Sequence, residues 1–415
     1  MNETPSAHMK WVSALSTHPS LETAVKEVAQ QAQDALNGCS PDFGMVFISS
    51  TFMSEYSRLM PLLQEFFPDT IFAGCSGGGI VGSDDAGESQ EIEGRTALSL
   101  SLAQLPQVNI HPFHIQTRRL PDLDGPPDAW VDLVGIPPHQ NPQFIILADP
   151  MSAGINDVLQ GMDFAYPGAV KIGGLASIGG PSGQSCLFLN GQDYYDGVIG
   201  IAMSGRIALE PIVAQGCRPI GGLYRVVEGD RNIILQVEEE QAEVGTGNIQ
   251  TPLDALQGVI KELDPDDLEL AQNSLFVGVA QSEFKRTLEQ GDFLIRNLLG
   301  VDPKLGALAV GERVRSGQRI QFHLRDAQTS ADDLVSLLET YVKKQSDQAM
   351  AALMFSCLGR GEMLYKEPNF DSGVLRRYLK NIPINGFFCN GEIGPVGGTT
   401  FIHGYTSVFG IVRQL

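Results

Sequence analysis

The hydrophobic positions of this chain form a strand–helix–strand pattern that occurs three times. In the first copy, the apolar run GMVFISS (44–50) is followed by a segment with helical spacing (55–67) and by IFAGCSGG from residue 71. A short apolar run is typical of a buried strand, and apolar residues three or four positions apart indicate a helix. The other two copies are FIILADP (144–150), GINDVLQGMDFAYP and KIGGLASIGG (171–180), and MAALMFSCLGRG (350–361), DSGVLRRYLKNI and INGFFCNGEIGPVGG (384–398).

Each copy ends in a cluster of glycines. Residues 74–82 contain five, residues 168–183 contain six and residues 386–398 contain five. Glycine lets a ligand approach the backbone closely and exposes N–H groups that can bind an anion. Three such strand ends would form a pocket if they converged. For any one cluster alone, a tight turn or a bulge is the ordinary interpretation.

Between these copies, runs of alternating or apolar residues are separated by turn residues, a pattern that predicts β-hairpins. So much antiparallel pairing predicts an α+β fold with two domains of largely antiparallel or mixed sheets covered by helices. Further helices are expected at 20–37, at 252–263 behind Thr251 and Pro252, and at 331–345 behind Ser330. The predicted hairpins pair TALSLSL with QVNIHPFHI, SCLFLNG with GVIGIAMSG, YRVVEG with NIILQV, ALAVGERV with RIQFHLR, and TFIHGY with VFGIVR.

The acidic, glycine-punctuated stretch VEEEQAEVGTGN (237–248) is the best candidate for a domain junction. It predicts domains at 1–237 and 238–415. At 415 residues, the chain is long enough for two domains that each bury a core.

The charge of the chain excludes some partners. There are 49 acidic residues against 28 Lys and Arg, a formal net charge of -21, and no basic run offsets it. Such a field repels nucleic-acid phosphates and anionic lipid head groups. We therefore expect neither nucleic acid nor a membrane surface as a partner.

The N-terminal sequence has neither the basic region nor the apolar core of a signal peptide, and no segment approaches 18 consecutive apolar residues. This predicts a cytoplasmic protein. The six cysteines are scattered without a C-x-x-C pair, which favours reduced thiols over disulfides or zinc. No metal site and no cofactor are expected.

Residues 74–78 fit the G-x-S-x-G elbow of serine hydrolases, with Ser76 as the nucleophile. That elbow requires a helix directly after the serine. The residues that follow, GGIVGSDDAGESQEIEG, lack helical spacing and are rich in helix breakers. A serine hydrolase is therefore disfavoured.

Gly77, Gly79 and Gly82 fit the G-x-G-x-x-G of dinucleotide-binding turns. Those glycines must open a helix whose N-terminus meets the pyrophosphate. Here the helical segment precedes the glycines, so this interpretation is also disfavoured.

Two cysteines and two charged residues lie beside the predicted strand ends. Cys75 and Cys389 are candidate reactive thiols, although a free cysteine in an apolar strand is more often a small hydrophobic residue. Arg360 follows a buried strand and Glu392 lies in CNGEIG. A charge beside a core strand is costly unless it is paired or meets a ligand. Arg360 could hold a carboxylate and Glu392 an ammonium group; alternatively they pair with each other or face solvent.

Three motifs carry a family resemblance: the shorter AGCSGGGI in the N-terminal half, and LMFSCLGRGEMLY and INGFFCNGEIGPVGGTTFIHGYTSVFGI in the C-terminal half. With these, the chain resembles the FIST family from about residue 30 to residue 412. Members carry an N-terminal and a C-terminal FIST domain, occur in bacterial signal transduction proteins and recur in a eukaryotic F-box protein.

The resemblance implies a sensory protein that binds a small ligand, an amino acid or related metabolite, and it implies no catalytic residue. Many members fuse the FIST pair to a kinase, chemoreceptor, cyclase or F-box module, for which these 415 residues leave no room. The signal is then expected to pass to a separate protein partner. The candidate ligand contacts are the motif positions Gly74, Cys75, Ser76, Gly77, Gly78, Ser356, Arg360, Gly361, Cys389, Asn390, Gly391, Glu392 and His403.

An enzyme remains the alternative from a different functional class. It would be a hydrolase or acyl transferase that uses Cys389, or Cys75 and Ser76, as nucleophile with His403 as base.

Overall fold

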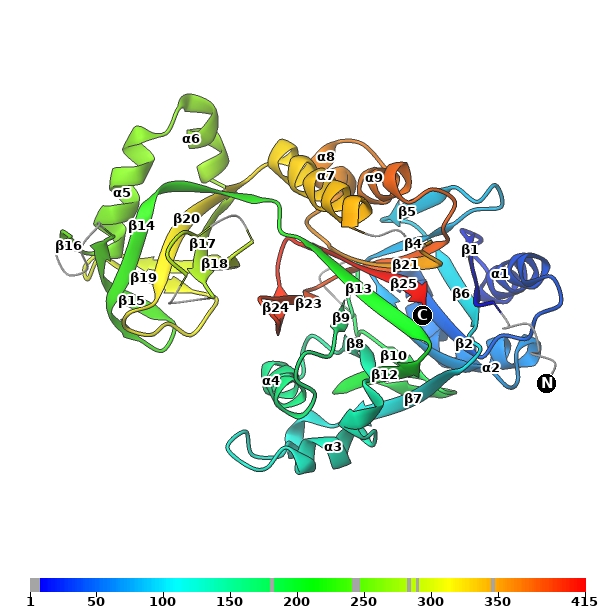
Figure 1. Ribbon diagram of the computed structural model, residues 1–415. Coiled ribbons are helices and arrows are strands. Elements are labelled where there is room, and N and C mark those ends of the chain that lie inside the picture. The colour runs from blue at the N-terminus through cyan, green and yellow to red at the C-terminus, as the bar shows by residue number, and fades with distance from the viewer. Residues whose placement is uncertain (1–7, 180–182, 241–246, 282–284, 289–290, 345–347) are drawn as a thin grey trace. The chain divides into compact units, whose positions relative to one another are not determined.

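The chain forms two compact units, which the computed structural model describes at residues 8–179, 183–240, 247–281, 285–288, 291–344 and 348–415 (Figure 1). Unit 1 comprises Met1–Ala214 and Val335–Leu415, and unit 2 is Gln215–Leu334. Unit 2 is therefore inserted into the sequence of unit 1. The predicted boundary at residue 237 falls inside a strand of unit 2, β15 (Ile233–Glu239). Residues 241–246 of the predicted junction and 180–182 of the second glycine cluster lie outside the described residues.

Unit 1 contains three copies of one order of elements, in which a strand, a helix, a strand, a helix and a strand are followed by a hairpin and a last strand. This order extends the strand–helix–strand repeat that the sequence predicts. The first copy is β1 (Lys10–Ser16), α1 (Leu21–Leu36), β2 (Phe43–Ser49), α2 (Tyr56–Phe66), β3 (Ile71–Gly77), β4 (Gly79–Ser83), β5 (Ser89–Glu93) and β6 (Leu98–Gln104).

The second copy follows the same order. The third has two helices in place of one between its parallel strands, and unit 2, which ends at Leu334 inside the first helix of this copy, interrupts it after its first strand. The second is β7 (Val108–Ile115), α3 (Asp128–Val134), β8 (Gln143–Ala148), α4 (Ile155–Ala165), β9 (Lys171–Leu175), β10 (Leu187–Leu189), β11 (Gln192–Tyr194) and β12 (Val198–Gly205). The third is β13 (Ile207–Ala214), α7 (Ala327–Lys344), β21 (Ala351–Cys357), α8 (Gly361–Tyr365), α9 (Phe370–Tyr378), β22 (Ile384–Cys389), β23 (Glu392–Val396), β24 (Thr399–His403) and β25 (Ser407–Gln414).

Each copy contributes one parallel strand pair to the centre of a six-stranded mixed sheet. The pairs are β2 with β3, β8 with β9, and β21 with β22. Each pair is flanked by antiparallel strands, which makes the sheets mixed and the fold α+β, as the sequence predicts. The strand orders are β1-β6-β2-β3-β10-β11, β24-β23-β9-β8-β12-β7 and β13-β25-β21-β22-β4-β5.

The hairpin of each copy pairs with the sheet of another copy. β4 of the first copy pairs with β22 of the third, β23 of the third pairs with β9 of the second, and β10 of the second pairs with β3 of the first. The exchange closes a ring. It requires the chain to cross from one sheet to the next directly after each parallel pair, at the glycine clusters.

This exchange explains why most of the predicted hairpins are wrong. All the segments involved form strands, but among the five predicted pairs only β14 (Cys217–Asp230) with β15 are hydrogen-bonded to each other. The members of the other pairs bond to different partners. In unit 1, β6 and β7 belong to different sheets, as do β10 and β12, and β24 and β25; in unit 2, β19 and β20 share a sheet without pairing.

The three sheets of unit 1 share one apolar core on their inner faces. Phe47 of β2 stacks on Phe387 of β22 with ring centroids 4.9 Å apart, and Phe355 of β21 meets the same ring edge-on. Helices cover the outer faces: α1 and α2 pack on the first sheet, and α3 and α4 on the second. Strand β2 is covered on both faces and is buried along its whole length. A strand in this position must be apolar throughout, which explains its apolar sequence.

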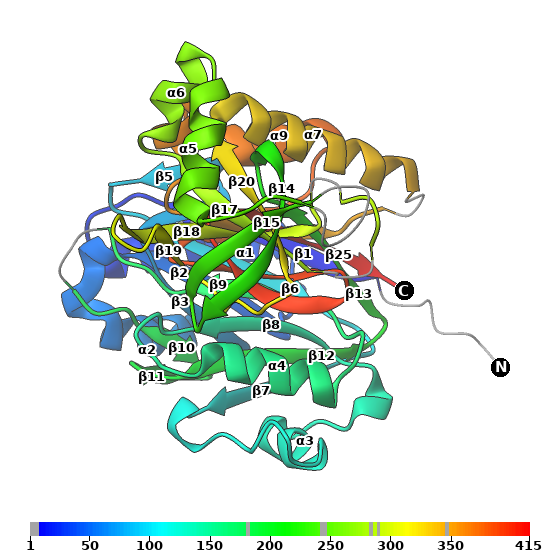
Figure 2. The same cartoon turned by 90° about the vertical axis from the view of Figure 1, so that its left-hand side faces the viewer.

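Unit 2 is a closed antiparallel barrel with helices α5 (Pro252–Glu262) and α6 (Pro265–Ala271) (Figure 2). The ring is closed by pairing between β14 and β15. Thr251 caps α5 by accepting a hydrogen bond from the Asp254 amide, as the sequence predicts. The strands in ring order are β14, β20 (Arg319–Arg325), β17 (Leu275–Ala280), β18 (Phe293–Asp302), β19 (Ala307–Val310) and β15, to which β16 (Ile249–Gln250) is added.

Helix α7 begins earlier than expected. It starts at Ala327, and Asp326 rather than Ser330 accepts the hydrogen bond from the amide of Thr329. The Ser330 hydroxyl is buried and donates to the Gly216 carbonyl.

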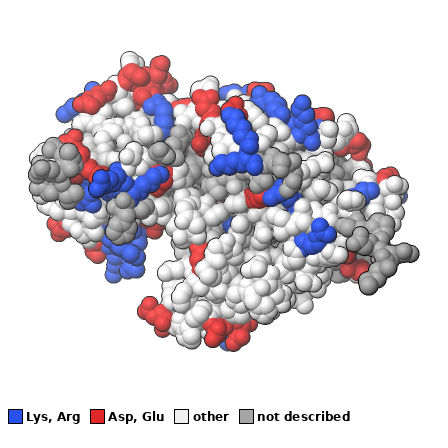
Figure 3. All heavy atoms as spheres, in the orientation of Figure 1, with Lys and Arg blue, Asp and Glu red and all other residues white. Residues whose placement is uncertain are grey.

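No helix within the described residues is long and apolar enough to cross a membrane. Acidic side chains lie in several separate groups on the face shown in Figure 3, with basic ones between them.

Candidate ligand-binding site

The three strand ends of unit 1 converge, and their backbones bond to one another. The Ser177 amide, just after β9, donates to the Ser76 carbonyl of β3 at 3.1 Å. The Ser177 hydroxyl accepts from the Gly78 amide at 2.8 Å and donates to the Phe388 carbonyl of β22. The Asn390 amide donates to the Leu175 carbonyl at 3.1 Å. The condition that the sequence left open, convergence of the three strand ends, is therefore met, and Ser177 connects all three.

The glycines at these tips serve packing of protein against protein. Gly74, Gly173 and Gly386 occupy equivalent positions in β3, β9 and β22, where an added Cβ would lie 1.8, 1.7 and 1.8 Å from a carbonyl oxygen of the parallel neighbour. At Gly78, an added Cβ would lie 2.5 Å from Leu358. The close approach that these glycines permit is made by the protein's own chain.

A cavity of about 540 Å³ opens beside the converged tips. Its walls come from the residues that follow β8, β9, β21 and β22 and from the segments on either side of the β10–β11 hairpin. It is lined by Asp149, Pro150, Met151, Ser177, Ile178, Gly183, Gln184, Ser185, Tyr195, Leu358 and Asn390.

Asp149 is the charged group of this cavity. It directly follows β8 and is only 4% exposed. Its Oδ1 accepts a hydrogen bond from the Ser185 hydroxyl and its Oδ2 one from the Ser152 hydroxyl, each at 2.8 Å. A carboxylate has about four lone-pair sites, so two remain for further donors.

A second cavity of about 440 Å³ shares Asp149, Met151 and Tyr195 with the first. Its other walls include Ser152 and Arg118. The Arg118 side chain is 87% exposed and lies 3.7 Å from the Asp196 carboxylate. The two cavities thus form one bipartite site, called here the Asp149 site, with Asp149 at the junction and the Arg118–Asp196 pair in one arm.

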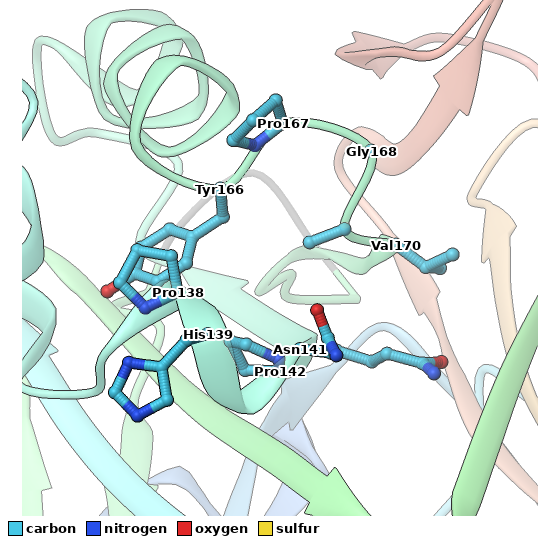
Figure 4. A pocket seen from close by; sticks show the side chains of 10 residues that line it. Pro138, His139, Asn141, Pro142, Tyr166, Pro167, Gly168 and Val170 are labelled. Carbon is cyan, nitrogen blue, oxygen red and sulfur yellow. The ribbon is translucent and has the colours of Figure 1, made fainter.

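A third cavity, of about 530 Å³, lies at the opposite ends of β8 and β9 (Figure 4). Pro138, His139 and Pro142 line one side of it, and Tyr166 and Pro167 line another. The Tyr166 hydroxyl donates to the Ile136 carbonyl at 2.7 Å. Among the residues that the structure describes, the His139 imidazole is the one acidic or basic side chain lining this cavity, so it offers fewer groups that could orient a charged ligand.

The two candidate thiols are poorly placed for chemistry. Cys75 and Cys389 are completely buried, and burial raises the pKa of each thiol well above its usual range. The thiolate is the nucleophilic form, so neither position favours it. The His403 ring bonds to the Gly394 carbonyl at 3.0 Å. Ser76 is buried as well, and its hydroxyl accepts from the Cys186 amide.

Arg360 is paired inside the protein. Its guanidinium donates to both carboxylate oxygens of Asp371, at 2.8 and 3.0 Å, and both side chains are 0% exposed. The same carboxylate accepts from Ser356 and Tyr365 hydroxyls. Of the two interpretations left open, internal pairing holds for Arg360, but with Asp371 in place of Glu392.

Glu392 is also completely buried, and its Oε2 accepts from the Thr406 amide at 3.1 Å. Burial raises the pKa of this carboxyl well above its usual range, and the nearby Arg360 charge opposes that shift only in part.

Two of the predicted glycine contacts have a positive φ: Gly361, at the start of α8, has a φ of +62°, and Gly391 has a φ of +159°. Of all the predicted contacts, only Asn390 lines the Asp149 site.

Sequence reasoning missed the residues that carry the polar chemistry of this site, which are Asp149, Ser152, Ser185 and Tyr195. One signal was present. Asp149 follows the apolar run FIILA, so it is a charge placed directly after a buried strand, the same feature that singled out Arg360. The serines and the tyrosine reach the site from separate loops, and no local pattern marks them.

Comparison with known proteins supports the family resemblance. Residues 42–240 match the FIST N domain and residues 252–395 match the FIST C domain. The chain belongs to the FIST family. FIST domains are associated with sensing in signal transduction. The FIST N match ends at residue 240 and the FIST C match begins at residue 252, near the predicted junction. The compact units of the FIST chain instead divide after Ala214 and after Leu334.

Relatives of this FIST protein include uncharacterised proteins of two mycobacteria. One from Mycobacterium tuberculosis is 30% identical over 95% of this chain and 97% of its own length, and one from Mycobacterium bovis is 30% identical over 94% and 95%. F-box only protein 22 of Pongo abelii is 39% identical over 12% of each chain.

One solved structure, a cyanuric acid hydrolase from A. caulinodans, aligns with 97% of this chain and 99% of its own. The sequence identity is 9% and the TM-score is 0.36. Values this low support no inference about a common fold or activity.

Proposed function

We propose that this FIST protein is a cytoplasmic sensor that binds a small polar metabolite, an amino acid or a related compound, at the Asp149 site and passes its state to a separate signalling protein. The observation that carries the proposal is the Asp149 carboxylate, which is 4% exposed and faces two adjoining cavities. A nearly buried charge is costly unless something compensates it. Two serine hydroxyls compensate it in part, and a ligand ammonium group would add the missing positive charge.

The arrangement of charges fits a zwitterion. An ammonium group at Asp149 leaves the attached carboxylate within the cavity that contains Arg118, where it would take the place of the exposed Asp196 carboxylate beside the guanidinium, because a guanidinium binds a carboxylate through paired hydrogen bonds. The side chain would then extend into the larger cavity beside Ile178, Leu358 and Asn390. The two cavities, of about 540 and 440 Å³, each lie within the range of about 300–1,000 Å³ typical of small-molecule sites.

A thermal-shift screen against the free amino acids and related metabolites tests the proposal. A ligand at about 100 times its dissociation constant stabilises the folded state by about 2.7 kcal/mol, which raises the melting temperature by several degrees. The variant Asp149→Asn should lose that shift. Asp132→Asn is the matched control, because Asp132 is exposed on α3 and lines neither cavity.

Two results would contradict the proposal. One is a panel in which no compound changes the melting temperature. The other is a shift that Asp149→Asn retains in full. The enzyme alternative predicts instead that Cys389→Ser abolishes turnover of an acyl or amide substrate, whereas a sensor with this geometry keeps its ligand response in that variant.

A further inference from the structure

Strand β5 contacts two helices of another copy through its glutamates. Glu93 accepts a hydrogen bond from the Glu362 amide in the first turn of α8 at 2.9 Å. Glu91 accepts one from the Ser372 amide in the first turn of α9 at 2.7 Å. The first-turn amides of a helix lack partners within the helix. The hairpin β4–β5 therefore satisfies helix ends that belong to the segment between β21 and β22.

The side chain of Asn369 makes two further hydrogen bonds that hold the hairpin on α9. The Glu91 amide donates to the side-chain oxygen of Asn369 at 2.6 Å, and the Asn369 amide group donates to Gln90 at 3.1 Å. Asn369 immediately precedes α9 and has a φ of +59°. Its side chain caps no amide of its own helix. The asparagine is instead used to dock β5.

The carboxyl group of Glu91 lies in an unfavourable place for a negative charge. It is 5% exposed, and its Oε2 is buried with no hydrogen-bond partner among the described residues. Asp371, whose charge acts on Glu91, is completely buried. The groups that face this pair are Arg360 and Tyr365 from the α8 segment and Glu93 from β5. Arg360 donates to Asp371, so its charge is already engaged.

We infer that Glu91 is a proton-dependent latch, which holds the β4–β5 hairpin on α8 and α9 when its carboxyl is neutral and loosens it when the carboxyl ionises. The neutral form removes the repulsion with Asp371 and keeps the carbonyl oxygen that accepts from Ser372. The ionised form places a second negative charge beside Asp371 in a region that excludes water. The inference concerns the protein without ligand and does not depend on the proposed function.

The direction in which pH changes the opening of the hairpin follows from the raised pKa of Glu91. Burial and the Asp371 charge raise the pKa of Glu91 to about 8, whereas a free Glu has a pKa of about 4.3. Between these values the closed hairpin binds one more proton than the opened one. Each rise of one pH unit in that range then favours opening by up to about tenfold. Above the pKa of the closed form, the dependence levels off.

Hydrogen exchange of the full chain measures the opening directly. Peptides covering residues 79–93 and 361–378 would be followed from pH 5.5 to pH 9, with intrinsic exchange rates corrected. We expect their opening constant to increase by at least tenfold up to pH 8 and then to level off. Peptides from the barrel strands β14 and β20 of unit 2 serve as the internal reference and should show no such rise.

Two variants separate the latch from a general effect of charge. Glu91→Gln cannot ionise and keeps the oxygen for Ser372, so its opening should lose most of its pH dependence, and what is left comes from Glu93, whose pKa is also raised by burial. Glu88→Gln is the matched control: Glu88 precedes the same strand, pairs with Arg376 and is 64% exposed, and this variant should retain the wild-type slope.

Three results would overturn the latch. The first is a wild-type opening constant that changes less than twofold over this pH range, which needs no variant to be seen. The second is an equal rise in the unit 2 reference peptides, which would indicate global unfolding. The third is a wild-type slope in folded Glu91→Gln.

Discussion

The strands β8 and β21 occupy equivalent positions in two copies of the repeat, and each is followed by a buried charge. After β8, Asp149 is held by two neutral serine hydroxyls and faces two cavities. After β21, Arg360 is bound to the Asp371 carboxylate and to the Tyr365 hydroxyl. One charge is compensated by its own chain, whereas the other is compensated only in part.

The difference between these two sites shows which of the two buried charges is available to bind a ligand. A buried ion pair with satisfied hydrogen bonds has no reason to recruit another partner, and breaking it leaves an uncompensated charge. A carboxylate that has only neutral donors, beside an open cavity, can still gain from a cation. The Arg360–Asp371 pair is therefore a structural element, and the Asp149 site is the candidate for binding.

The largest expected effect is the loss of the Arg360–Asp371 pair. Arg360→Met should reduce the free energy of unfolding by about 3–5 kcal/mol, because it leaves Asp371 buried without its cation. Urea denaturation measures the change. Arg376→Met is the control: its partner Glu88 is 64% exposed, and such surface pairs contribute at most about 1 kcal/mol. Equal losses in both variants would contradict the structural role assigned to Arg360.

A smaller loss is expected from the glycines at the equivalent strand positions. Gly173→Ala places a Cβ against the Ile146 carbonyl of β8, and overpacking of this kind costs about 1–3 kcal/mol or more. Gly373→Ala is the control, because an added Cβ there meets no atom within 4 Å and the residue lies in helix α9. That variant should be stabilised by up to about 1 kcal/mol. Thermal or urea unfolding of both variants tests the contrast.

The Asp149 site should tolerate substitution better. Ser185→Ala removes one hydroxyl that donates to Asp149, and we expect a loss of about 0.5–1.5 kcal/mol together with a weaker thermal shift by any ligand of the site. Ser57→Ala, at an exposed position of α2, should change neither quantity. A loss as large as that of Arg360→Met would show that Asp149 is structural too.

The smallest effect concerns the cysteines, whose reactivity should differ without any change in stability. Cys39 and Cys357 are partly exposed, whereas Cys75 and Cys389 are buried with raised pKa values. In the native protein at pH 8, a thiol reagent should label Cys39 and Cys357 first and leave the buried pair unlabelled. Mass spectrometry of labelled peptides measures this order. Rapid labelling of Cys389 would revive the enzyme alternative.

Some elements could be predicted because local chemistry specifies them. The helix at 252–262 begins where Thr251 and Pro252 indicate a start, and α2 follows the spacing of its apolar residues. The three strand–helix–strand units could likewise be recognised, since their strands are buried on both faces and must be apolar throughout.

The pairing of strands and the position of the cavity could not be predicted from local sequence. The segment after β3 has the turn signals of a hairpin, but it crosses to β22 instead of returning to its own sheet. Asp149 and Ser185 are 36 residues apart, and nothing local to either indicates the other. The glycines were expected to let a ligand approach the backbone, but at Gly74, Gly173 and Gly386 the approaching group is another strand.

The sequence by itself determined the α+β class, the three repeated units, the family and the glycine-rich ends of the strands, because each depends on the spacing and type of neighbouring residues. Only the tertiary structure decided that these ends meet at Ser177, that Arg360 is already paired with Asp371, and that Asp149 faces a cavity. Arg360 and Asp371 are 11 residues apart and Asp149 and Ser185 are 36 apart, and no local pattern shows whether a buried charge meets its partner, so its compensation is settled only when the chain folds.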